Sequence, residues 1–552
     1  MLVTDVNELK VWLRLQKVVC IDTETNVTDL DHKRFLVGIS FTGEDFLPFY
    51  LPVGHTAAIV PVENFKLWDF THDLRPDVTL VMHNAKFDLK VLKKAGVNLT
   101  GCDVADTMLW HHLIDQYRPH SLEALEKKFL NRTLKGELVK QIRELVKTVG
   151  MEGIPPIAMA KYAENDVIST LQLYYLFLPQ LVERGLLEVW QDDQRFMKLL
   201  ILIEESGLRL DRQLAQHLVE KSTTRIQSIQ EMLPFDPAKP SEISERFYGE
   251  FPDGLGLRPS KRTPTGKPST DESAMATIAH PEAGLLIEYR GLQKALSTWF
   301  QGLQDKADDQ GYVHPSFKQH GTLTHRLSGE NPNPQQFPRE GQVKKLFLPE
   351  DGCDLIEFDY RAIEFRLAAF YAQCKPLIDV FRENGDIHQA VAEALGIGRQ
   401  AAKNTNFCIL YLGGPNRIAE TAGIPIGEAR AIYKKYHELY PEIFAISDLC
   451  ESLAKKRGWV KYWTGHRRVF KEDYECRKAF NSIIQGGAFK VIQKSMVELN
   501  AQGVDMRNQV HDAVWINHPK GQSTDLIVST MEDWTEGQFG FKFHVESKVL
   551  HS

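Results

Sequence analysis

The sequence predicts a multidomain α/β protein. Its 552 residues exceed the usual size of one domain and suffice for two or three. Short β-branched and aromatic runs between residues 17 and 60 predict strands, and VTLVMHNAK predicts a further buried strand before the helical pattern FDLKVLKKA. A mostly helical pattern continues from about Asp106 to Gln191. We therefore expect the first part of the chain to be an α/β domain with a mixed sheet.

The rest of the chain is predicted to hold a long helical region and then shorter elements. Polar loops interrupt the helical region, and residues 259–273 (PSKRTPTGKPSTDES) form its most loop-like segment. From Thr322 onward we expect short strands and helices to alternate.

Composition and charge narrow the class of protein. No apolar stretch is long enough to cross a bilayer, so we expect no membrane partner. The seven cysteines form no CxxC pair, which favours a reduced cytoplasmic location over a zinc site or a disulfide framework. The net charge of −7 does not decide nucleic-acid binding, because phosphate binding depends on local patches. A basic, aromatic stretch at residues 455–478 is by itself more typical of a solvated surface.

Carboxylates gather at the end of the first predicted strand. In IDTET, Asp22 and Glu24 are two residues apart, and strand alternation puts both side chains on one face. Such carboxylates repel each other unless a cation lies between them, so a divalent metal is the natural occupant. This motif alone is more typical of ordinary surface acids. HNAKFDLKVL adds Asp88 at the start of a helix, and KYAENDV adds Tyr162 and Asp166 on one helical face.

A second pair of carboxylates lies in the last two hundred residues. The apolar strand in CDLIEFDYRAIEFR ends at Asp359, and NQVHDAVWINHP carries His511 and Asp512 between β-branched and aromatic residues, which predicts a hairpin. Two aspartates on adjacent strands would hold two Mg²⁺ ions about 3.5–4 Å apart, the geometry needed for in-line nucleotidyl transfer. Neither dipeptide is informative by itself.

A predicted helix between these two acids carries a stripe of cations and rings. In RQAAKNTNFCILYLGG four side chains recur every fourth residue and so line one broad helical face. They are Arg399, Lys403, Phe407 and Tyr411. Cations suit a triphosphate, and rings suit a base and sugar. The alternative is an amphipathic helix with a mixed exposed face.

A second stripe repeats this spacing in ECRKAFNSIIQGGAFK. Arg477, Asn481 and Gln485 are again four residues apart. Their guanidinium and amide groups suit the minor-groove edge of a duplex, where the acceptors barely differ between base pairs. Such contacts would not depend on the base sequence of the duplex.

Taken in order, these motifs resemble two known families. The stretches around Asp22, Asp88 and Asp166 resemble the three exonuclease motifs of the DnaQ-like proofreading fold. The order THRLSGENPNPQQFP, FDYRAIEFR, GDIH, RQAAKNTNFCILY, RKAFNSIIQGG and VHD resembles family A DNA polymerases, the bacterial polymerase I and phage replicative type. The resemblance implies an RNase H-like 3′-5′ exonuclease domain at 1–190 and a right-hand polymerase domain at 191–552. Within the latter it implies a thumb at about 191–320, a palm at about 321–372 and 478–552, and fingers at about 373–477.

The resemblance also implies metal ligands at matching positions. The exonuclease would hold two Mg²⁺ ions, or Mn²⁺ in their place, on four acids: Asp22, Glu24, Asp88 and Asp166. Tyr162 would help to orient the attacking water. The polymerase would hold two more ions on Asp359, Asp512 and the backbone carbonyl of Tyr360.

Substrate contacts are implied in the same way. The incoming triphosphate would be gripped by three residues, Arg399, Lys403 and His388. Phe407 would stack on the sugar and base, and Tyr411 would occupy the template-base position until the fingers close. Glu364 would be the steric gate that excludes a 2′-hydroxyl. Seven residues would contact primer and template: Arg326, Asn333, Gln335, Arg477, Asn481, Gln485 and His511.

The sequence departs from the family pattern at several positions. Ala513 stands where a glutamate usually follows His-Asp, and Lys490 stands where an aspartate is common. The other departures are Cys408 and Leu412 in place of two glycines, and Arg361 and Ala362 in place of Ser-Gln. None of them is a predicted side-chain metal ligand, and together they indicate a divergent member of the phage type.

We therefore expect a template-directed, primer-dependent DNA polymerase with 3′-5′ proofreading that serves phage DNA replication. Its partners would be primer–template DNA and deoxynucleoside triphosphates, and it would act as a monomer in the host cytoplasm. The sequence identifies no helicase, single-strand-binding or processivity partner.

Three alternatives stay open. The first is a single-subunit phage-type RNA polymerase, which Glu364 as a gate and an attached exonuclease disfavour. The second is a non-catalytic DNA-binding module descended from a polymerase, which the intact acids Asp359 and Asp512 disfavour. The third is an exonuclease whose C-terminal part only holds DNA. It would be excluded if strand extension survived replacement of Asp22 and Glu24.

Overall fold

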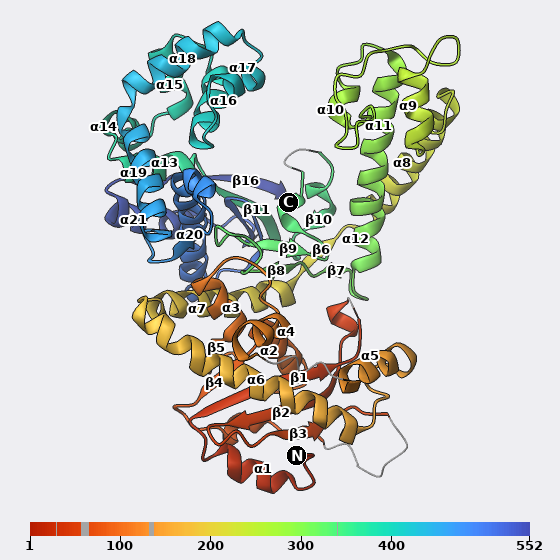
Figure 1. Ribbon diagram of the computed structural model, residues 1–552, viewed down its shortest axis with the longest axis vertical. Coiled ribbons are helices and arrows are strands. Elements are labelled where there is room, and N and C mark those ends of the chain that lie inside the picture. The colour runs from red at the N-terminus through yellow and green to blue at the C-terminus, as the bar shows by residue number, and fades with distance from the viewer. Residues whose placement is uncertain (29, 57–65, 132–136, 339–340) are drawn as a thin grey trace. The chain divides into compact units, whose positions relative to one another are not determined.

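The computed structural model describes residues 1–28, 30–56, 66–131, 137–338 and 341–552 (Figure 1). They form two compact units, each described by itself below. The larger unit comprises Met1–Ser206, Pro315–Gln335 and Ile356–Val549, and the smaller comprises Gly207–His314, Gln336–Leu355 and Leu550–Ser552. No helix in the described ranges is both long and apolar enough to cross a lipid bilayer. The prediction of a mixed α/β protein is confirmed.

The first part of the larger unit is built on a five-stranded mixed sheet in the order β3-β2-β1-β4-β5. The central strand β1 pairs antiparallel with β2 and parallel with β4, as the predicted mixed sheet requires. Its successive apolar residues Val19, Cys20 and Ile21 are buried, so this strand is covered on both faces. The strands are β1 Val18–Thr25, β2 Leu36–Gly43, β3 Phe49–Pro52, β4 Thr79–Met82 and β5 Asp103–Asp106.

Helices pack around this sheet, and the long helix α6 contacts β1, β2, β3 and β4. Asp106 fixes the start of α2 and of α3, since its carboxylate accepts two backbone N–H groups at each helix start, at 2.7–3.2 Å. These bonds satisfy donors that a helix N-terminus leaves unpaired, and they hold α2 against the sheet edge. The helices are α1 Val6–Leu13, η1 Asp31–Lys33, η2 Phe70–Asp73, α2 Ala85–Lys94, α3 Thr107–Ile114, α4 Leu122–Leu125, η3 Glu126–Leu130, α5 Glu137–Val149, α6 Pro156–Glu183 and α7 Leu187–Ser206.

The last part of the larger unit is built on a four-stranded sheet in the order β14-β15-β11-β16. Strands β14 and β15 form the predicted hairpin, with Val510 paired to Ala513 across a two-residue turn. His511 in that turn has a φ of 53°, the left-handed conformation that tight hairpin turns require. The strands of this part are β8 Ser316–Lys318, β9 Ser328–Glu330, β11 Cys353–Tyr360, β12 Trp459–Lys461, β13 Arg467–Val469, β14 Met506–Val510, β15 Ala513–Pro519 and β16 Val545–His551.

The predicted alternation of strands and helices after Thr322 is wrong between Ile363 and Arg457, where seven helices follow one another without a strand. Apolar residues there recur at helical spacing, as in α15, which buries Val391, Ala392 and Leu395. The helices of this part are η5 Pro334–Gln336, α13 Ile363–Ala372, α14 Lys375–Arg382, α15 Ile387–Leu395, α16 Arg399–Leu410, α17 Pro415–Ala422, α18 Ile426–Leu439, α19 Pro441–Arg457, η7 Asp473–Lys478, α20 Ala479–Ala501 and α21 Asp525–Phe539.

The smaller unit joins a helical bundle to a short sheet in the order β10-β6-β7. Its helices bury two small apolar clusters, one of which centres on Ile243 and Phe247. The expected loop at 259–273 is confirmed as far as Asp271, after which α10 begins. The elements are β6 Leu208–Leu210, α8 Arg212–Met232, α9 Pro240–Tyr248, α10 Glu272–Met275, α11 Pro281–Ala295, η4 Leu296–Phe300, α12 Gln301–Lys306, β7 Tyr312–Val313, η6 Lys344–Leu346 and β10 Phe347–Leu348.

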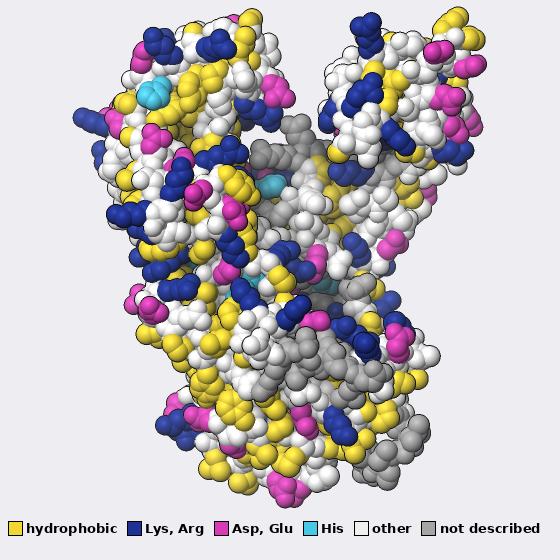
Figure 2. Space-filling model, in the orientation of Figure 1, with side chains coloured by type: hydrophobic (Ala, Val, Ile, Leu, Met, Phe, Trp, Pro, Cys, Tyr) yellow, Lys and Arg dark blue, Asp and Glu magenta, His cyan; other side chains and the backbone are white. Residues whose placement is uncertain are grey.

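The basic, aromatic stretch at 455–478 is only partly the solvated surface that was expected. Lys and Arg side chains gather on the visible face over α19 and α20 (Figure 2), and Lys455, Lys456 and Arg457 are exposed at the end of α19. Arg468 in the same stretch is buried, with its guanidinium 4.6 Å from the centre of the Phe470 ring. The stretch therefore combines exposed cations with a buried anchor.

A buried ion pair joins α7 to α20. Lys490 Nζ lies 2.8 Å from Asp193 Oδ1, and Asp193 also bonds His466 Nε2 at 3.0 Å and Gln493 Nε2 at 2.9 Å. Burial by itself would raise the pKa of Asp193, but Lys490 and His466 hold that pKa well below its usual range. Burial lowers the pKa of Lys490, against the opposing effect of Asp193. The departure at Lys490 thus has a structural reason, because an aspartate there would face a buried carboxylate.

Lys490→Met is expected to lower the free energy of unfolding by about 3–5 kcal/mol, because it leaves Asp193 buried without its main cation. Thermal or urea unfolding of the variant and the unchanged protein measures this. Lys435→Met, which removes an exposed lysine from α18, is the matched control and should change stability by about 0.5 kcal/mol or less. Equal stability of Lys490→Met and the unchanged protein would contradict the assigned role of the pair.

Candidate active sites

The first candidate site lies where β1 ends. Asp22 and Glu24 project from β1, opposite Ser40 and Gly38 of β2. A carboxylate oxygen of each lies within 4.8 Å of the other and of an oxygen of Asp166, which α6 contributes. The alternation of β1 and the packing of α6 therefore bring Asp166 to Asp22 and Glu24, which lie more than a hundred residues earlier in the sequence.

Electrostatics in this group match a site for a divalent cation. Burial, followed by the charges of Asp88, Glu24 and Asp166, raises the pKa of Asp22 well above its usual value. Burial and the charges of Asp166 and Asp88 raise the pKa of Glu24 to about 8. Carboxylates that repel one another favour an added positive charge, and oxygen ligands are those that Mg²⁺ prefers. The donor set therefore fits the predicted metal ion.

Tyr162 lies one helical turn before Asp166 on α6 and beside the same acids. Burial raises the pKa of its hydroxyl, and the charges of Asp166, Glu24 and Asp22 add to that effect. The hydroxyl therefore stays protonated and can donate a hydrogen bond within the site.

Asp88 lies next to this group but is not one of the three converging acids. Its Oδ1 accepts hydrogen bonds from Thr23 N at 3.1 Å and from Thr23 Oγ1 at 2.7 Å. Burial raises the pKa of Asp88 to about 7 despite these bonds. The sequence predicts four acids acting alike, whereas in this structure Asp88 is tied to the residue between Asp22 and Glu24.

The second candidate site lies at the β14–β15 turn. The backbone N–H of Tyr360 donates to the carbonyl of Asp512 at 3.3 Å, so Asp359 at the end of β11 lies beside Asp512 in the turn. Asp359 is exposed and Asp512 is half-buried. The Tyr360 hydroxyl is directed away into the core, where it bonds Ser495 Oγ and the Met531 carbonyl at 2.6 Å. The two aspartates therefore share one edge of the sheet.

A polar network covers this pair of aspartates. Arg326 Nη2 lies 3.3 Å from Asp512 Oδ1, and Arg326 Nη1 lies 3.4 Å from Glu364 Oε1. The Tyr411 hydroxyl donates to Glu364 Oε2 at 2.9 Å. Burial, followed by the charge of Glu364, raises the pKa of Tyr411 to about 12. The predicted gate, the predicted template-side ring and a predicted catalytic acid thus belong to one hydrogen-bonded group.

Helix α16 presents the predicted stripe outward. Arg399 and Tyr411 are exposed and Lys403 and Phe407 are half-buried, while the opposite face of α16 is buried. The Phe407 and Tyr411 rings are stacked, with centroids 6.4 Å apart. Tyr411 is the C-cap residue that directly follows α16, so the stripe spans the whole helix and its cap.

Two residues of this site were missed from the sequence. Asp386 Oδ2 accepts from Arg399 Nε at 2.7 Å, and Asp386 also caps α15 by accepting from His388 N at 2.8 Å. Asn406 Nδ2 lies 3.0 Å from His388 Nδ1. Asp386 lies in the GDIH motif and precedes a helix, so its capping role was detectable. Asn406 is one residue from the stripe on the buried side, where sequence spacing gave no signal.

The contact to Asn406 and burial together bear on the state of His388. With the Asn406 amide nitrogen as the donor, His388 Nδ1 accepts and Nε2 carries the hydrogen. Burial lowers the pKa of His388 to about 4, so the ring is neutral near pH 7. His388 therefore offers one N–H donor from the same side as Phe407, whose ring centroid is 5.9 Å away.

The predicted DNA contacts are distributed around the second site. Gln335 Nε2 donates to the Gln509 carbonyl at 3.1 Å, and Gln335 Oε1 accepts from His511 N at 2.8 Å. Asn333 Oδ1 accepts from Gln335 N at 3.0 Å. Both predicted contacts thus lie beside the hairpin turn that carries His511.

The second predicted stripe is not one continuous helical face. Arg477 lies in the 3₁₀ turn η7, and only Asn481 and Gln485 lie in α20. Asn481 Nδ2 donates to the Leu410 carbonyl at 3.1 Å, which ties α20 to the end of α16. Gln485 is half-buried and hydrogen-bonds Tyr411. Arg477 is exposed.

Comparison with known proteins assigns the family. Residues 206–551 match the model of DNA polymerase family A, and residues 2–182 match that of the 3′-5′ exonuclease. The chain belongs to DNA polymerase family A. The resemblance drawn from the motifs is thereby confirmed, as is the order of an exonuclease domain before a family A polymerase domain. The domain boundaries and the residue roles stay predictions.

This family A polymerase is similar to polymerases of bacteria and of a phage. It is 29% identical over 513 residues to DNA polymerase I of Treponema pallidum (strain Nichols), which covers 85% of the chain and 50% of that protein. It is 27% identical over 546 residues to DNA polymerase DpoZ of Salmonella phage PMBT28, which covers 87% of the chain and 86% of that protein. The chain thus spans about half the length of the Treponema polymerase.

The fold of this family A polymerase is also similar to a solved structure. The POL domain of Pol1 from M. smegmatis, in complex with DNA primer-template and dNTP, superposes with a TM-score of 0.83. The match covers 99% of this chain and 98% of that one at 19% sequence identity. At this identity the likeness shows the fold alone.

Proposed function

We propose that this family A polymerase extends a DNA primer along a template and removes nucleotides from the 3′ end at a separate site. The observation that carries the proposal is the hydrogen bond from Tyr360 N to the Asp512 carbonyl, since it sets the two aspartates side by side. A further support is the outward stripe of α16, which supplies cations and rings near the gate residue Glu364.

Each site is proposed to hold two Mg²⁺ ions, or Mn²⁺ in their place. The polymerase site would use Asp359, Asp512 and the Tyr360 carbonyl, and the exonuclease site would use Asp22, Glu24, Asp88 and Asp166. When bound, the ions would supply Lewis-acid stabilisation of the charge that develops at the reacting phosphate. The raised pKa of Asp22 and Glu24 supports a cation in the exonuclease site.

Protein groups would bind and orient the deoxynucleoside triphosphate. Arg399 and Lys403 would neutralise its phosphates, and the His388 Nε2–H would donate to one of them. Phe407 would stack on the sugar and base. Before Arg399 can bind a phosphate, its guanidinium must leave Asp386, to which it donates a hydrogen bond at 2.7 Å. The exposed Asp359 and the half-buried Asp512 would lie on the primer side.

Primer–template DNA would lie along the remaining polar groups. The residues that would contact it are Arg326, Asn333, Gln335, Arg477, Asn481, Gln485 and, in the hairpin turn, His511. In the exonuclease site, the protonated Tyr162 hydroxyl would orient the attacking water. We propose that the chain acts as a monomer in the cytoplasm, where its seven free cysteines fit a reducing compartment.

Asp359→Ala or Asp512→Ala is expected to lower primer extension by about 1,000-fold or more, because each removes one of the two proposed side-chain metal ligands. Degradation of single-stranded DNA should be retained, since Asp22 and Glu24 are intact. The reciprocal variant, Asp22→Ala with Glu24→Ala, should lose degradation and keep extension. Gel assays of both activities on labelled oligonucleotides measure this, with the exposed Asp309→Ala as the control. Parallel loss of both activities in a folded Asp512→Ala protein would contradict two separate sites.

Glu364→Ala is expected to raise the ratio of ribonucleotide to deoxynucleotide incorporation by about 10-fold or more, because it removes the bulk proposed to meet a 2′-hydroxyl. Glu364→Gln keeps that bulk and is the matched control. Glu364→Ala also removes the hydrogen bond from the Tyr411 hydroxyl. Tyr411→Phe removes that bond but keeps the Glu364 side chain, so it separates the loss of the bond from the loss of bulk. Single-nucleotide insertion kinetics with dNTP and rNTP measure the ratio. If all three variants share the ratio of the unchanged protein, Glu364 is not the gate.

We also propose that the chain serves phage DNA replication, which its similarity to the DpoZ polymerase of a Salmonella phage supports. A replicative enzyme should copy a long, primed, circular single-stranded DNA template to full length when dNTPs are in excess. The length distribution of products under single-encounter conditions measures this. Products of only a few nucleotides would favour a repair role instead.

A further inference from the structure

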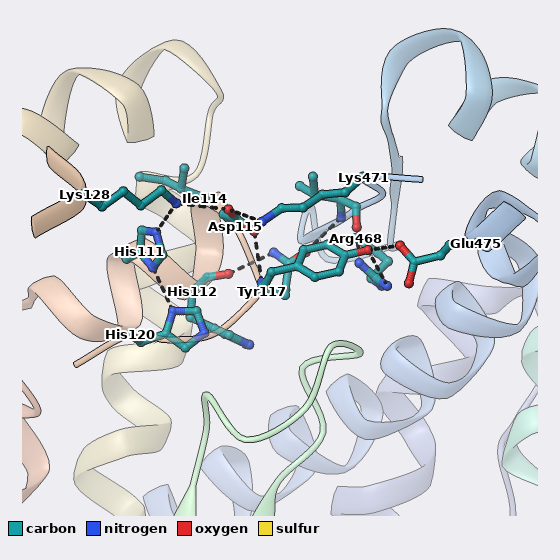
Figure 3. A network of polar contacts seen from close by, with 12 residues as sticks. His111, His112, Ile114, Asp115, Tyr117, His120, Lys128, Arg468, Lys471 and Glu475 are labelled. Carbon is teal, nitrogen blue, oxygen red and sulfur yellow. Dashed lines mark hydrogen bonds and ion pairs between the residues drawn. The ribbon is translucent and has the colours of Figure 1, made fainter. Parts of the chain in front are cut away.

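The loop after α3 in the exonuclease domain contacts the polymerase domain within the larger unit. Three consecutive residues make this contact: Asp115, Gln116 and Tyr117, hereafter the 115–117 segment. They meet β13 and η7, which are more than 350 residues away in sequence. Figure 3 shows Tyr117 pointing at Glu475 of η7, with Lys471 along one face of the ring.

Gln116 anchors the middle of the segment. Its Oε1 accepts from Val469 N at 2.9 Å, and its Nε2 donates to the His112 carbonyl at 2.9 Å. Gln116 is 1% exposed, so both ends of its amide are satisfied inside the protein. A buried amide with two partners fixes the distance between the end of α3 and β13.

Tyr117 connects the segment to η7. Its hydroxyl donates to Glu475 Oε2 and accepts from Arg468 Nη2 at 3.3 Å. Its ring lies 4.3 Å from Lys471 Nζ and 5.1 Å from the Arg468 guanidinium, measured to the ring centre. The ring and the hydroxyl therefore engage three polymerase residues at once.

Ion pairs of Asp115 add to the contact between the 115–117 segment and the polymerase domain. Asp115 Oδ2 lies 3.0 Å from Lys471 Nζ and 3.4 Å from Lys128 Nζ. Burial alone would raise the pKa of Asp115, but the Tyr117 N–H and Lys471 hold that pKa below its usual value. Lys471 is therefore shared between a carboxylate and a ring that both belong to the 115–117 segment.

The polymerase element held in this way leads directly to proposed DNA contacts. Glu475 lies two residues before Arg477 in η7, and α20 with Asn481 begins at Ala479. Cys476 between them is buried, so η7 is anchored on one side while Arg477 remains exposed on the other. The direction of Arg477 is thus set by how η7 is held.

We propose that the 115–117 segment is a positioning element, carried by the exonuclease domain, that holds Arg477 in place for primer–template DNA. This inference rests on the proposed function. It assigns to the exonuclease domain a part in DNA binding by the polymerase that is separate from its own acids. Tyr117 acts through Glu475 and does not itself touch DNA.

The test compares DNA affinity with exonuclease activity. Tyr117→Phe removes the hydroxyl that donates to Glu475 and keeps the ring beside Lys471. The dissociation constant for primer–template DNA is expected to rise about fivefold, while the rate of degradation of single-stranded DNA stays unchanged. Tyr175→Phe, on the exposed face of α6, is the matched control and should change neither. Fluorescence anisotropy with a labelled primer–template measures the affinity.

Two further variants separate positioning from general stability. Glu475→Gln keeps an oxygen acceptor for Tyr117 and should retain affinity, whereas Glu475→Ala should match Tyr117→Phe. Arg477→Ala should weaken binding by itself, and Tyr117→Phe should add nothing to it, because the two act on one contact.

The outcomes are distinct. Additive effects of Tyr117→Phe and Arg477→Ala, or an unchanged affinity in both Tyr117→Phe and Glu475→Ala, would overturn this inference while leaving the proposed function intact. Parallel loss of exonuclease activity and DNA affinity in Tyr117→Phe would also overturn it, since that pattern indicates a structural role only. Failure of the unchanged protein to bind or extend a primer–template would instead overturn the proposed function.

Discussion

Repulsion between converging carboxylates is the constraint on which both sites depend. In the exonuclease site, oxygens of Asp22, Glu24 and Asp166 lie within 4.8 Å of one another. In the polymerase site, a two-residue hairpin turn brings Asp512 beside Asp359 at the end of a neighbouring strand. Both arrangements need positive charge close by, from a divalent cation or from a basic side chain. The fold brings Asp22 and Glu24 of β1 to Asp166 of α6, and Asp512 of the hairpin turn to Asp359 of β11.

In the polymerase site the protein supplies counter-charges of its own. Arg326 pairs with both Asp512 and Glu364, and Arg399 pairs with Asp386. Both arginines are proposed substrate contacts, so binding of DNA and nucleotide exchanges an internal ion pair for one with a phosphate. An arginine does not lose its proton, so its charge must be matched in either state. The internal pairs therefore give each arginine a carboxylate partner until the substrate supplies a phosphate.

Local patterns predicted what local geometry determines. The alternation of β1 predicted that Asp22 and Glu24 share one face of the strand. The four-residue spacing in α16 predicted that Arg399 and Phe407 share one face of the helix. Periodicity carries no information on long-range partners, so no pattern predicted that Thr23 binds Asp88. The same holds for the bonds of Lys490, and for Tyr117, whose partner is 358 residues away. The 3₁₀ conformation at Arg477 was not predicted either, because 3₁₀ and α-helical spacing differ little over one turn.

Three of the departures from the family pattern, Cys408, Leu412 and Ala362, have consequences for the backbone around them. A side chain on Gly413 would place its Cβ 2.2 Å from Cys408 Sγ, so the larger Cys408 requires glycine at that point. Leu412 has a φ of 64° and Ala362 a φ of 49°, a left-handed backbone that costs a non-glycine residue about 1–3 kcal/mol. Leu412 follows Tyr411 directly, and Ala362 lies two residues before Glu364. Because Tyr411 and Glu364 bond each other, a residue with a left-handed backbone lies close in sequence to each partner of this contact.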